Sequence, residues 1–447
     1  MSFVKIDISF KRIQQLAIPA IIAGIAEPVL SSTDAAVVGN MAENSVQSLA
    51  AVGIVGSFLS MLIWILGQTR SAISAIISQN LGAGKLKDIK VLPAQAIYFN
   101  IILSIIVLGG TYFFVEEIFT LLKAKDLVLD LSIDYYNIRV WGFPFTLFTF
   151  AIFGIFRGLQ NTFWPMIVAI IGASINVLLD FALVYGVEGY IPAMAVKGAA
   201  WASLISQIIM AIMALALLLL KTDVSLKLVL PLHSEIKRLA TMSLNLFVRS
   251  FSLNVALILA MREATAINDE TAAAHTIAAN IWLFTAFFID GYGAAGNVLS
   301  GRLLGANDYK NLWLLTKRVV KYNLIVAIIL IIVCTIFYTQ LGFLFNKKQE
   351  VLTIFYSIFF MVIIMQPINA LAFTLDSIFK GLGEMAWLRN TLLIATFLGF
   401  VPVLYLSKYL DYGIIGIWVA FMVWMIFRAS ALIYFYRKKY YTLAIDK

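Results

Sequence analysis

The chain has 447 residues, of which 62% are hydrophobic and only 13% are charged, with a mean hydropathy of +0.94. A soluble domain carries about 25% charged residues. So much apolar surface cannot be hidden in a water-soluble core, so lipid must be the solvent for most of the chain. A single cysteine, Cys334, excludes a disulfide framework and any multi-cysteine metal site.

Long apolar segments indicate membrane spans, because about 20 apolar residues suffice to cross the hydrocarbon layer as a helix. Twelve such segments are predicted, separated by short connections without an inserted soluble domain. The first half of the chain contains Arg12–Gly39, Val46–Leu81, Val91–Val115, Leu127–Ile155, Phe163–Val187 and Ala195–Leu220. The second half contains Ile236–Met261, Thr271–Leu304, Leu312–Leu341, Val351–Ile378, Leu388–Ser407 and Ile414–Tyr436.

The distribution of Lys and Arg predicts the orientation. Most of the 33 Lys and Arg residues fall in the connections on the side of the N-terminus, which predicts cytoplasmic chain ends in a plasma (inner) membrane. The net charge of +9 is therefore interpreted as a topology signal and not as a nucleic-acid footprint. No small-residue cleavage site follows the first apolar segment, which is expected to stay as a membrane helix.

An internal repeat relates the two halves. A shift of 223 positions, without gaps, places Pro144 on Pro367, Trp164 on Trp387, and the segment 156–159 on 379–382. Proline and tryptophan are uncommon here, so these coincidences carry more weight than those of Leu or Ala. The shift predicts an all-α membrane protein of twelve helices in two parallel six-helix lobes, residues 1–222 and 223–447, around a central cleft.

Several segments resemble a known transporter family. Leu81-Gly82-Ala83-Gly84 follows the second apolar segment, and Leu304-Gly305-Ala306-Asn307 follows the eighth. Helix 1 reads Ala17-Ile18-Pro19-Ala20, then Glu27-Pro28, then Thr33-Asp34-Ala35-Ala36-Val37-Val38-Gly39, and helix 5 contains Asn176-Val177-Leu178-Leu179-Asp180. In order and spacing these segments, over essentially the whole chain, resemble the multidrug and toxic compound extrusion (MATE) family, in its DinF-like branch. The resemblance implies cation-coupled export of amphipathic, often cationic compounds by alternating access.

Ionisable residues inside the spans are the candidate functional residues, because they are costly in hydrocarbon. Asp34 is expected in the outer half of helix 1, and Asn176 and Asp180, four residues apart, share a face of helix 5. Two carboxylates in a poorly hydrated pocket cannot both stay ionised cheaply, which suits proton pick-up and release. Their oxygens, with that of Asn176, would equally suit Na⁺. The family carries its coupling cation on residues that Asp34, Asn176 and Asp180 match, and it links a helix-1 proline, matched by Pro19, to bending of that helix.

The candidate cation site of Asp34, Asn176 and Asp180 occurs only in the first half of the chain. Shifted by 223 residues, Asp34 falls on Leu257 and Asp180 on Val403. As an alternative, Asp34 caps helix 1 or pairs with an arginine. Glu27 is expected either to attract a cationic substrate or to pair with a buried arginine, and Tyr135 and Tyr136 to face the cation pocket.

Four arginines, Arg70, Arg139, Arg249 and Arg428, lie inside predicted spans. They are interpreted as structural partners of Glu27, of Asp290 or of backbone carbonyls. Asp290, in helix 8, is a candidate second polar site in the other lobe, with a structural role as its alternative.

The sequence therefore predicts a drug antiporter driven by H⁺ or Na⁺, without a cofactor or a bound metal other than that Na⁺. No GxxxxGK[ST] loop offers ATP as an energy source. The expected partners are small organic substrates and the lipid bilayer, not nucleic acid, and the protein is expected to be a monomer. One alternative is a flippase for lipid-linked saccharides. An intramembrane protease is disfavoured because HExxH and GxGD motifs are missing, and a channel is disfavoured by the two-lobe repeat.

Overall fold

The computed structural model describes residues 6–41 and 44–445, without the side chains of residues 27–32. The chain forms two compact units, which are described separately. Unit 1 comprises Met1–Ile21, Ser78–Gly84 and Leu244–Lys447, and unit 2 comprises Ile22–Ile77 and Lys85–Ser243. The lobes 1–222 and 223–447 stay a prediction.

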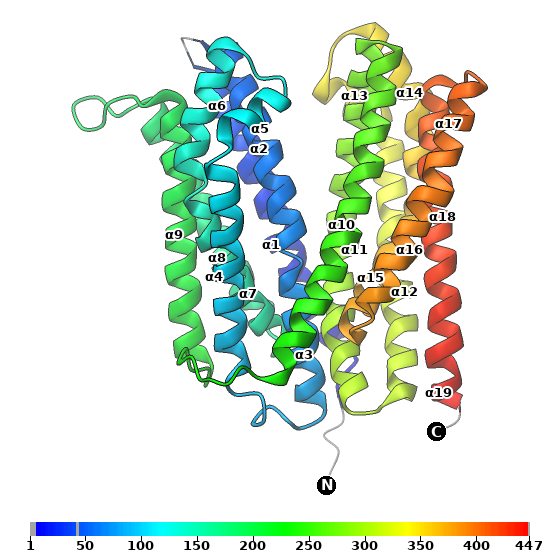
Figure 1. Cartoon of the computed structure of the whole chain (residues 1–447). Helices are drawn as coiled ribbons and strands as arrows, with labels where there is room; N and C mark the ends of the chain where they lie inside the picture. Colours follow the sequence, from blue (N-terminus) through cyan, green and yellow to red (C-terminus); the bar gives the residue numbers. More distant parts are fainter. Residues whose placement is uncertain (1–5, 42–43, 446–447) are drawn as a thin grey trace. The chain divides into compact units, whose positions relative to one another are not determined.

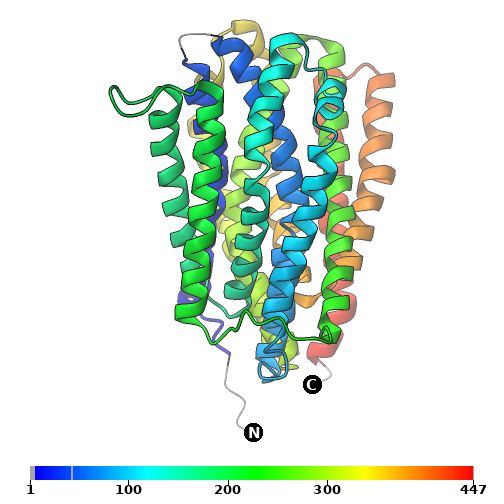
Figure 2. The ribbon, with the colours of Figure 1, turned by 60° about the vertical axis from the view of Figure 1, so that its left-hand side comes forward.

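Unit 2 is a bundle of apolar helices (Figure 1). It contains most of α1 (Phe10–Gly39), α2 (Ser45–Leu66), most of α3 (Thr69–Gly82), α4 (Leu92–Tyr112), α5 (Val115–Leu121), α6 (Asp126–Arg139), α7 (Gly142–Gly158), α8 (Phe163–Val184), α9 (Ala195–Lys221) and the first residues of α10 (Ser234–Ile267). Helices α8 and α9 pack along each other, and their connection projects from one end (Figure 2). This packing brings side chains of α8 and α9 together.

Unit 1 repeats this pattern. It contains most of α10, then α11 (Asp269–Gly305), α12 (Tyr309–Ile336), α13 (Tyr338–Phe345), α14 (Gln349–Ile364), α15 (Gln366–Leu382), α16 (Met385–Ile394), the π-helix η1 (Ala395–Phe400), α17 (Val401–Tyr409), α18 (Gly413–Tyr436), the π-helix η2 (Arg437–Tyr441) and α19 (Thr442–Ile445). Pro402 is the second residue of α17, which follows η1, and a proline without an N–H favours such a local change of winding.

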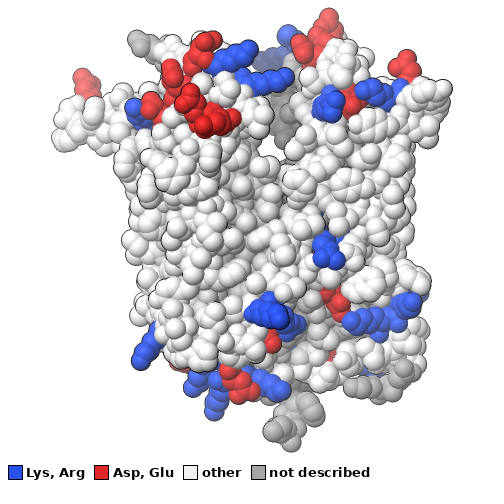
Figure 3. Space-filling view, in the orientation of Figure 1, with Lys and Arg blue, Asp and Glu red and all other residues white. Residues whose placement is uncertain are grey.

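The predicted spans are confirmed as helices. Among the described residues, 9 helical segments are long and apolar enough to cross a membrane, or up to 11 when two bent pairs each count as one span. Helix α1, with 30 residues, occupies the place of the first predicted span. On the faces seen in Figure 3, charged side chains gather at the two ends of the helices and leave a broad, nearly uncharged band between them.

The two bent spans occupy corresponding places in the repeat. Helices α6 and α7 meet at 47°, and α14 and α15 meet at 52°. Pro144 stands in the first turn of α7, and Pro367 stands at the start of α15. Proline cannot donate a backbone hydrogen bond and crowds the preceding turn, which bends a helix. The proline coincidence in the sequence thus corresponds to a shared break in the fold.

Two glycines at one end of unit 1 make reciprocal contacts, here called the glycine crossing. A Cβ atom on Gly82 of α3 would overlap the carbonyl oxygen of Arg302 in α11. A Cβ atom on Gly305 of α11 would overlap the carbonyl oxygen of Gln79 in α3. The shift of 223 that relates Gly82 to Gly305 also relates Gln79 to Arg302. Each backbone therefore approaches the other only because the same position lacks a side chain in both copies.

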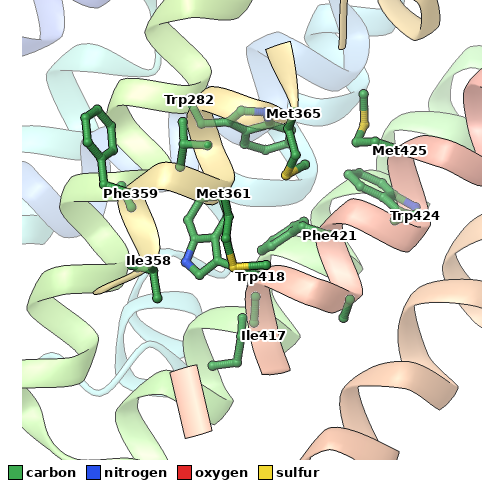
Figure 4. Packing of buried hydrophobic residues seen from close by; sticks show 14 of the residues in the cluster. Trp282, Ile358, Phe359, Met361, Met365, Ile417, Trp418, Phe421, Trp424 and Met425 are labelled. Atoms are coloured by element: carbon green, nitrogen blue, oxygen red, sulfur yellow. The ribbon is translucent and has the colours of Figure 1, made fainter. Parts of the chain in front are cut away.

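The core of unit 1 is aromatic. Trp282 of α11, Met361 of α14, and Trp418, Phe421 and Trp424 of α18 are buried in one cluster (Figure 4). The rings of Trp418 and Phe421 lie 5.4 Å apart, and those of Phe421 and Trp424 lie 6.0 Å apart. Such large apolar side chains dominate the packing that holds the helices of this unit together.

Candidate functional site

Asp34 is the centre of a buried polar cluster in unit 2. Its side chain accepts hydrogen bonds from two other helices. Ser203 of α9 donates one to Oδ2 at 3.1 Å, and Tyr135 of α6 donates one to the same oxygen at 3.4 Å. Arg139, one helical turn after Tyr135, places Nη2 at 3.9 Å from the same oxygen. Asp34 is only 3% exposed, so this carboxyl group depends on protein partners and not on water.

Asn176 and Asp180 of α8 complete the cluster. Asn176 donates a hydrogen bond from Nδ2 to Ser203 Oγ at 3.2 Å, and Asp180 lies close enough to Asp34 for the two carboxyl groups to interact electrostatically. No N–H or hydroxyl group of the described residues reaches either oxygen of Asp180, which is fully buried. Two neighbouring carboxylates in a buried site repel each other, and a proton on one of them removes that repulsion. The geometry therefore suits a pair that shares one proton.

The charges of this cluster balance with a single added cation. Two carboxylates contribute two negative charges and Arg139 contributes one positive charge. One proton or one monovalent metal ion makes the cluster neutral, which a buried site favours. Oxygens of Asp34, Asn176 and Asp180 that accept no hydrogen bond offer the hard ligands that Na⁺ prefers, so the residues also fit that ion.

Pro19 lies inside α1, which continues past it. The residues before it belong to unit 1, and the boundary between the units falls between Ile21 and Ile22. A proline cannot donate the usual hydrogen bond to the carbonyl four residues earlier, so this part of the helix bends at low cost. Pro19 is therefore placed where one helix passes from one unit into the other. The side chain of Glu27 lies outside the described part of the structure.

The two adjacent tyrosines take different directions. Tyr135 reaches Asp34, whereas the ring of Tyr136 packs edge-on against Phe119 at 5.4 Å and beside Phe58 at 6.1 Å. Tyr136 belongs to the apolar core of unit 2 and not to the cation cluster. Successive residues on a helix point about 100° apart, so only one of the pair can face Asp34.

Asp290 lies on α11 in unit 1 and is exposed. It does not join the cluster around Asp34 but interacts electrostatically with Arg428 and Lys380.

The structure changes the expected partners of the span arginines. Arg139 pairs with Asp34, and Arg249 pairs with Asp376 of α15 at 2.5 Å. Arg428 lies 3.8 Å from Asp376, in addition to its interaction with Asp290. Asp376 was not singled out in the sequence, although its spacing of four residues from Lys380 was a usable signal. Ser203 was also missed, since a serine in an apolar helix is too common to mark a site.

Comparison with known proteins gives consistent matches. The model of the MatE family matches residues 19–182 and 239–406, once in each half of the chain. Protein DETOXIFICATION 42 of Arabidopsis thaliana is 26% identical over 341 residues, covering 73% of this chain and 64% of that protein. The chain thus spans less than two thirds of that relative. DNA damage-inducible protein F of Escherichia coli K12 is 23% identical over 437 residues, covering 96% and 92%.

The fold is also that of a solved transporter. A structure described as the outward-facing conformation of a multidrug resistance MATE family transporter of the MOP superfamily matches with a TM-score of 0.87. The two chains are 21% identical, and the match covers 97% of this chain and 96% of the other. The twelve-helix, two-lobe architecture predicted from the sequence is confirmed.

Proposed function

Because the chain belongs to the MatE family, whose members are transporters and not enzymes, we propose that it exports amphipathic or cationic organic compounds in exchange for H⁺ or Na⁺. The observation that carries the coupling is the Asp34–Asp180 pair, which is buried and needs one added cation for neutrality. The substrates are small organic molecules, and the protein works as a monomer in the plasma (inner) membrane with both chain ends in the cytoplasm.

The cation acts through helix α1. Asp34 is held by donors on α6 and α9, and Asp180 of α8 interacts with it electrostatically. Loss of the shared proton creates repulsion between the two carboxylates and strengthens the attraction to Arg139. The part of α1 that carries Asp34 then changes its position, and Pro19 absorbs the bend. Cation entry and exit thereby alternate the access of the substrate path.

The test is dye efflux from proteoliposomes under an imposed proton gradient or an imposed Na⁺ gradient. We expect the wild-type protein to export an ethidium-like cation with one gradient and Asp34→Asn to lose that dependence. Asp134→Asn is the matched control, because it removes an exposed carboxylate of α6 whose partner is Lys197 at 3.2 Å. Equal, gradient-dependent efflux by wild type and Asp34→Asn would remove Asp34 from the coupling site. Absence of efflux under both gradients would refute drug export and make lipid-linked saccharides the next substrates to test.

A further inference from the structure

A second buried charge cluster lies in unit 1, centred on Asp376 of α15. Arg249 of α10 donates to Asp376 Oδ1 from Nε at 3.0 Å and from Nη2 at 2.5 Å. Lys380, one turn later on α15, places Nζ at 3.0 Å from Oδ2. Arg428 of α18 places Nη2 at 3.8 Å from Oδ1. Three cations from three helices thus converge on one carboxylate.

The cluster holds more positive than negative charge. The side chains of Asp376 and Arg249 are each 7% exposed, and that of Arg428 is 2% exposed. Asp290 of α11 is close enough to interact with Lys380 and Arg428, and it is exposed. Even with Asp290 counted, three cations face two carboxylates. Glu263, the other buried carboxylate of this unit among the described residues, pairs elsewhere, with Lys408 at 2.7 Å.

Arg428 is the cation that is least satisfied. Its Nη2 is buried and makes no hydrogen bond within the described residues. The guanidinium lies 4.9 Å from the centre of the Trp424 ring and 5.4 Å from that of the Phe373 ring. These rings hold the side chain in place, and Nη1 donates a hydrogen bond to the sulfur of Met425 at 3.3 Å, which leaves Nη2 without one. A fixed guanidinium with a free N–H is a ready binding group for a carboxylate.

We infer that this cluster, centred on Arg428, binds a carboxylate group of the transported solute. One bound carboxylate makes the cluster of Arg249, Lys380, Arg428, Asp376 and Asp290 neutral and satisfies the free N–H of Arg428. A buried excess charge without such a ligand is costly.

The apolar part of the ligand has suitable neighbours. The Phe373 ring lies 6.5 Å from that of Trp282, and Trp282 belongs to the aromatic core shared with Trp424 (Figure 4). An amphipathic solute places its carboxylate at Arg428 and its apolar body against Phe373, which is only partly buried where it packs on this core. This cluster therefore adds amphipathic carboxylates, zwitterionic or anionic, as a specific group among the amphipathic compounds proposed above.

The two charge clusters are opposite in sign and neither is duplicated. Shifted back by 223 residues, Asp376 falls on Phe153 and Arg428 falls on Ile205. Unit 2 carries an acidic pair that needs a cation, and unit 1 carries a basic cluster that needs an anion. This division separates the coupling ion from the acidic group of the solute.

The binding test uses dansyl-glycine and its uncharged amide, which differ only in the carboxylate. Binding to the purified full-length protein in a neutral detergent is measured by fluorescence anisotropy, and folding by gel filtration and thermal unfolding. We expect wild type to bind the acid about tenfold or more tightly than the amide, as one paired buried charge allows. Arg428→Gln should lose this preference. Equal binding of acid and amide by wild type overturns the inference.

A second variant covers the case in which Arg428→Gln does not fold. Asp290→Asn removes an exposed, repelling carboxylate and should strengthen binding of the acid by about threefold, without changing binding of the amide. An unchanged affinity for the acid contradicts the charge-balance argument.

That the ligand is a transported substrate rests on the proposed function, but its binding does not. Asp34→Asn, which should not transport, should bind dansyl-glycine as wild type does. A protein that exports cationic dyes and shows no preference for the acid refutes only the carboxylate site.

Discussion

When H⁺ is the coupling ion, the number of protons that the cluster around Asp34 exchanges determines how strongly the solute ratio across the membrane depends on the pH difference. In the proposed mechanism, Asp34 and Asp180 hold one proton between them beside Arg139, so one proton enters and leaves the cluster in each cycle. With the membrane potential held at zero, a one-to-one exchange supports a solute ratio of about tenfold for each pH unit across the membrane. Two protons would support about a hundredfold for each unit.

Asp180→Asn should abolish that dependence. The amide keeps the shape of the protonated carboxyl group, and the remaining Asp34 is neutralised by Arg139. The cluster is then neutral without an exchangeable proton, so the solute ratio should stay near one at every imposed pH difference.

The assay is the steady-state solute ratio in proteoliposomes with potassium and valinomycin holding the potential at zero. The logarithm of the ratio is plotted against the pH difference. For wild type and for Asp134→Asn we expect a slope of about one. A wild-type slope of two, or an Asp180→Asn slope equal to that of wild type, would refute the count of one shared proton.

Changes at three further places in the structure can be tested by thermal unfolding and transport. Gly82→Ala and Gly305→Ala should each destabilise the protein by about 1–3 kcal/mol, because the added Cβ atom overlaps a carbonyl oxygen. Gly53→Ala is the control: it lies in open space on α2 and should be neutral or slightly stabilising. Equal stability of all three variants would contradict the glycine crossing. Asp376→Asn leaves Arg249, Lys380 and Arg428 without their carboxylate and should lower the free energy of unfolding by about 3–5 kcal/mol. An unchanged unfolding temperature would show that the cluster is not held by charge pairing. Pro19→Ala restores a backbone donor to α1 and should slow coupled transport without lowering stability; wild-type transport rates in this variant would argue against the bend.

The sequence predicted the fold well because each part of that prediction depends on local composition. The length of an apolar segment directly reflects the thickness of the hydrocarbon layer, so the spans could be placed within a few residues. Pro144 and Pro367 marked the repeat, and the structure shows that both follow a break in a span. A bend angle, however, depends on packing against neighbouring helices, and no local pattern determines it.

The candidate site was only partly accessible from the sequence. Asp34, Asn176 and Asp180 could be grouped because carboxylates and amides are rare in apolar helices. Ser203 could not, since its importance comes from lying between Asp34 and Asn176 in space.

The basic cluster was missed for a related reason. The predicted tenth span ends at Ile378, which leaves Lys380 outside it. In the structure α15 continues to Leu382, and Lys380 turns back onto Asp376. A long lysine side chain can reach a buried partner from near the end of a helix, so hydropathy alone misplaces it.

The glycine crossing also bears on how the two halves of the chain can diverge. In an assembly of two identical halves, any substitution at this position would appear on both sides of the contact at once, and a harmful one would count twice. Joined in one chain, the copies can change singly. Gln79 and Arg302 have already become different residues, because they contribute their backbone carbonyls to the contact. Gly82 and Gly305 remain the same, because each provides the space that the other copy's backbone fills.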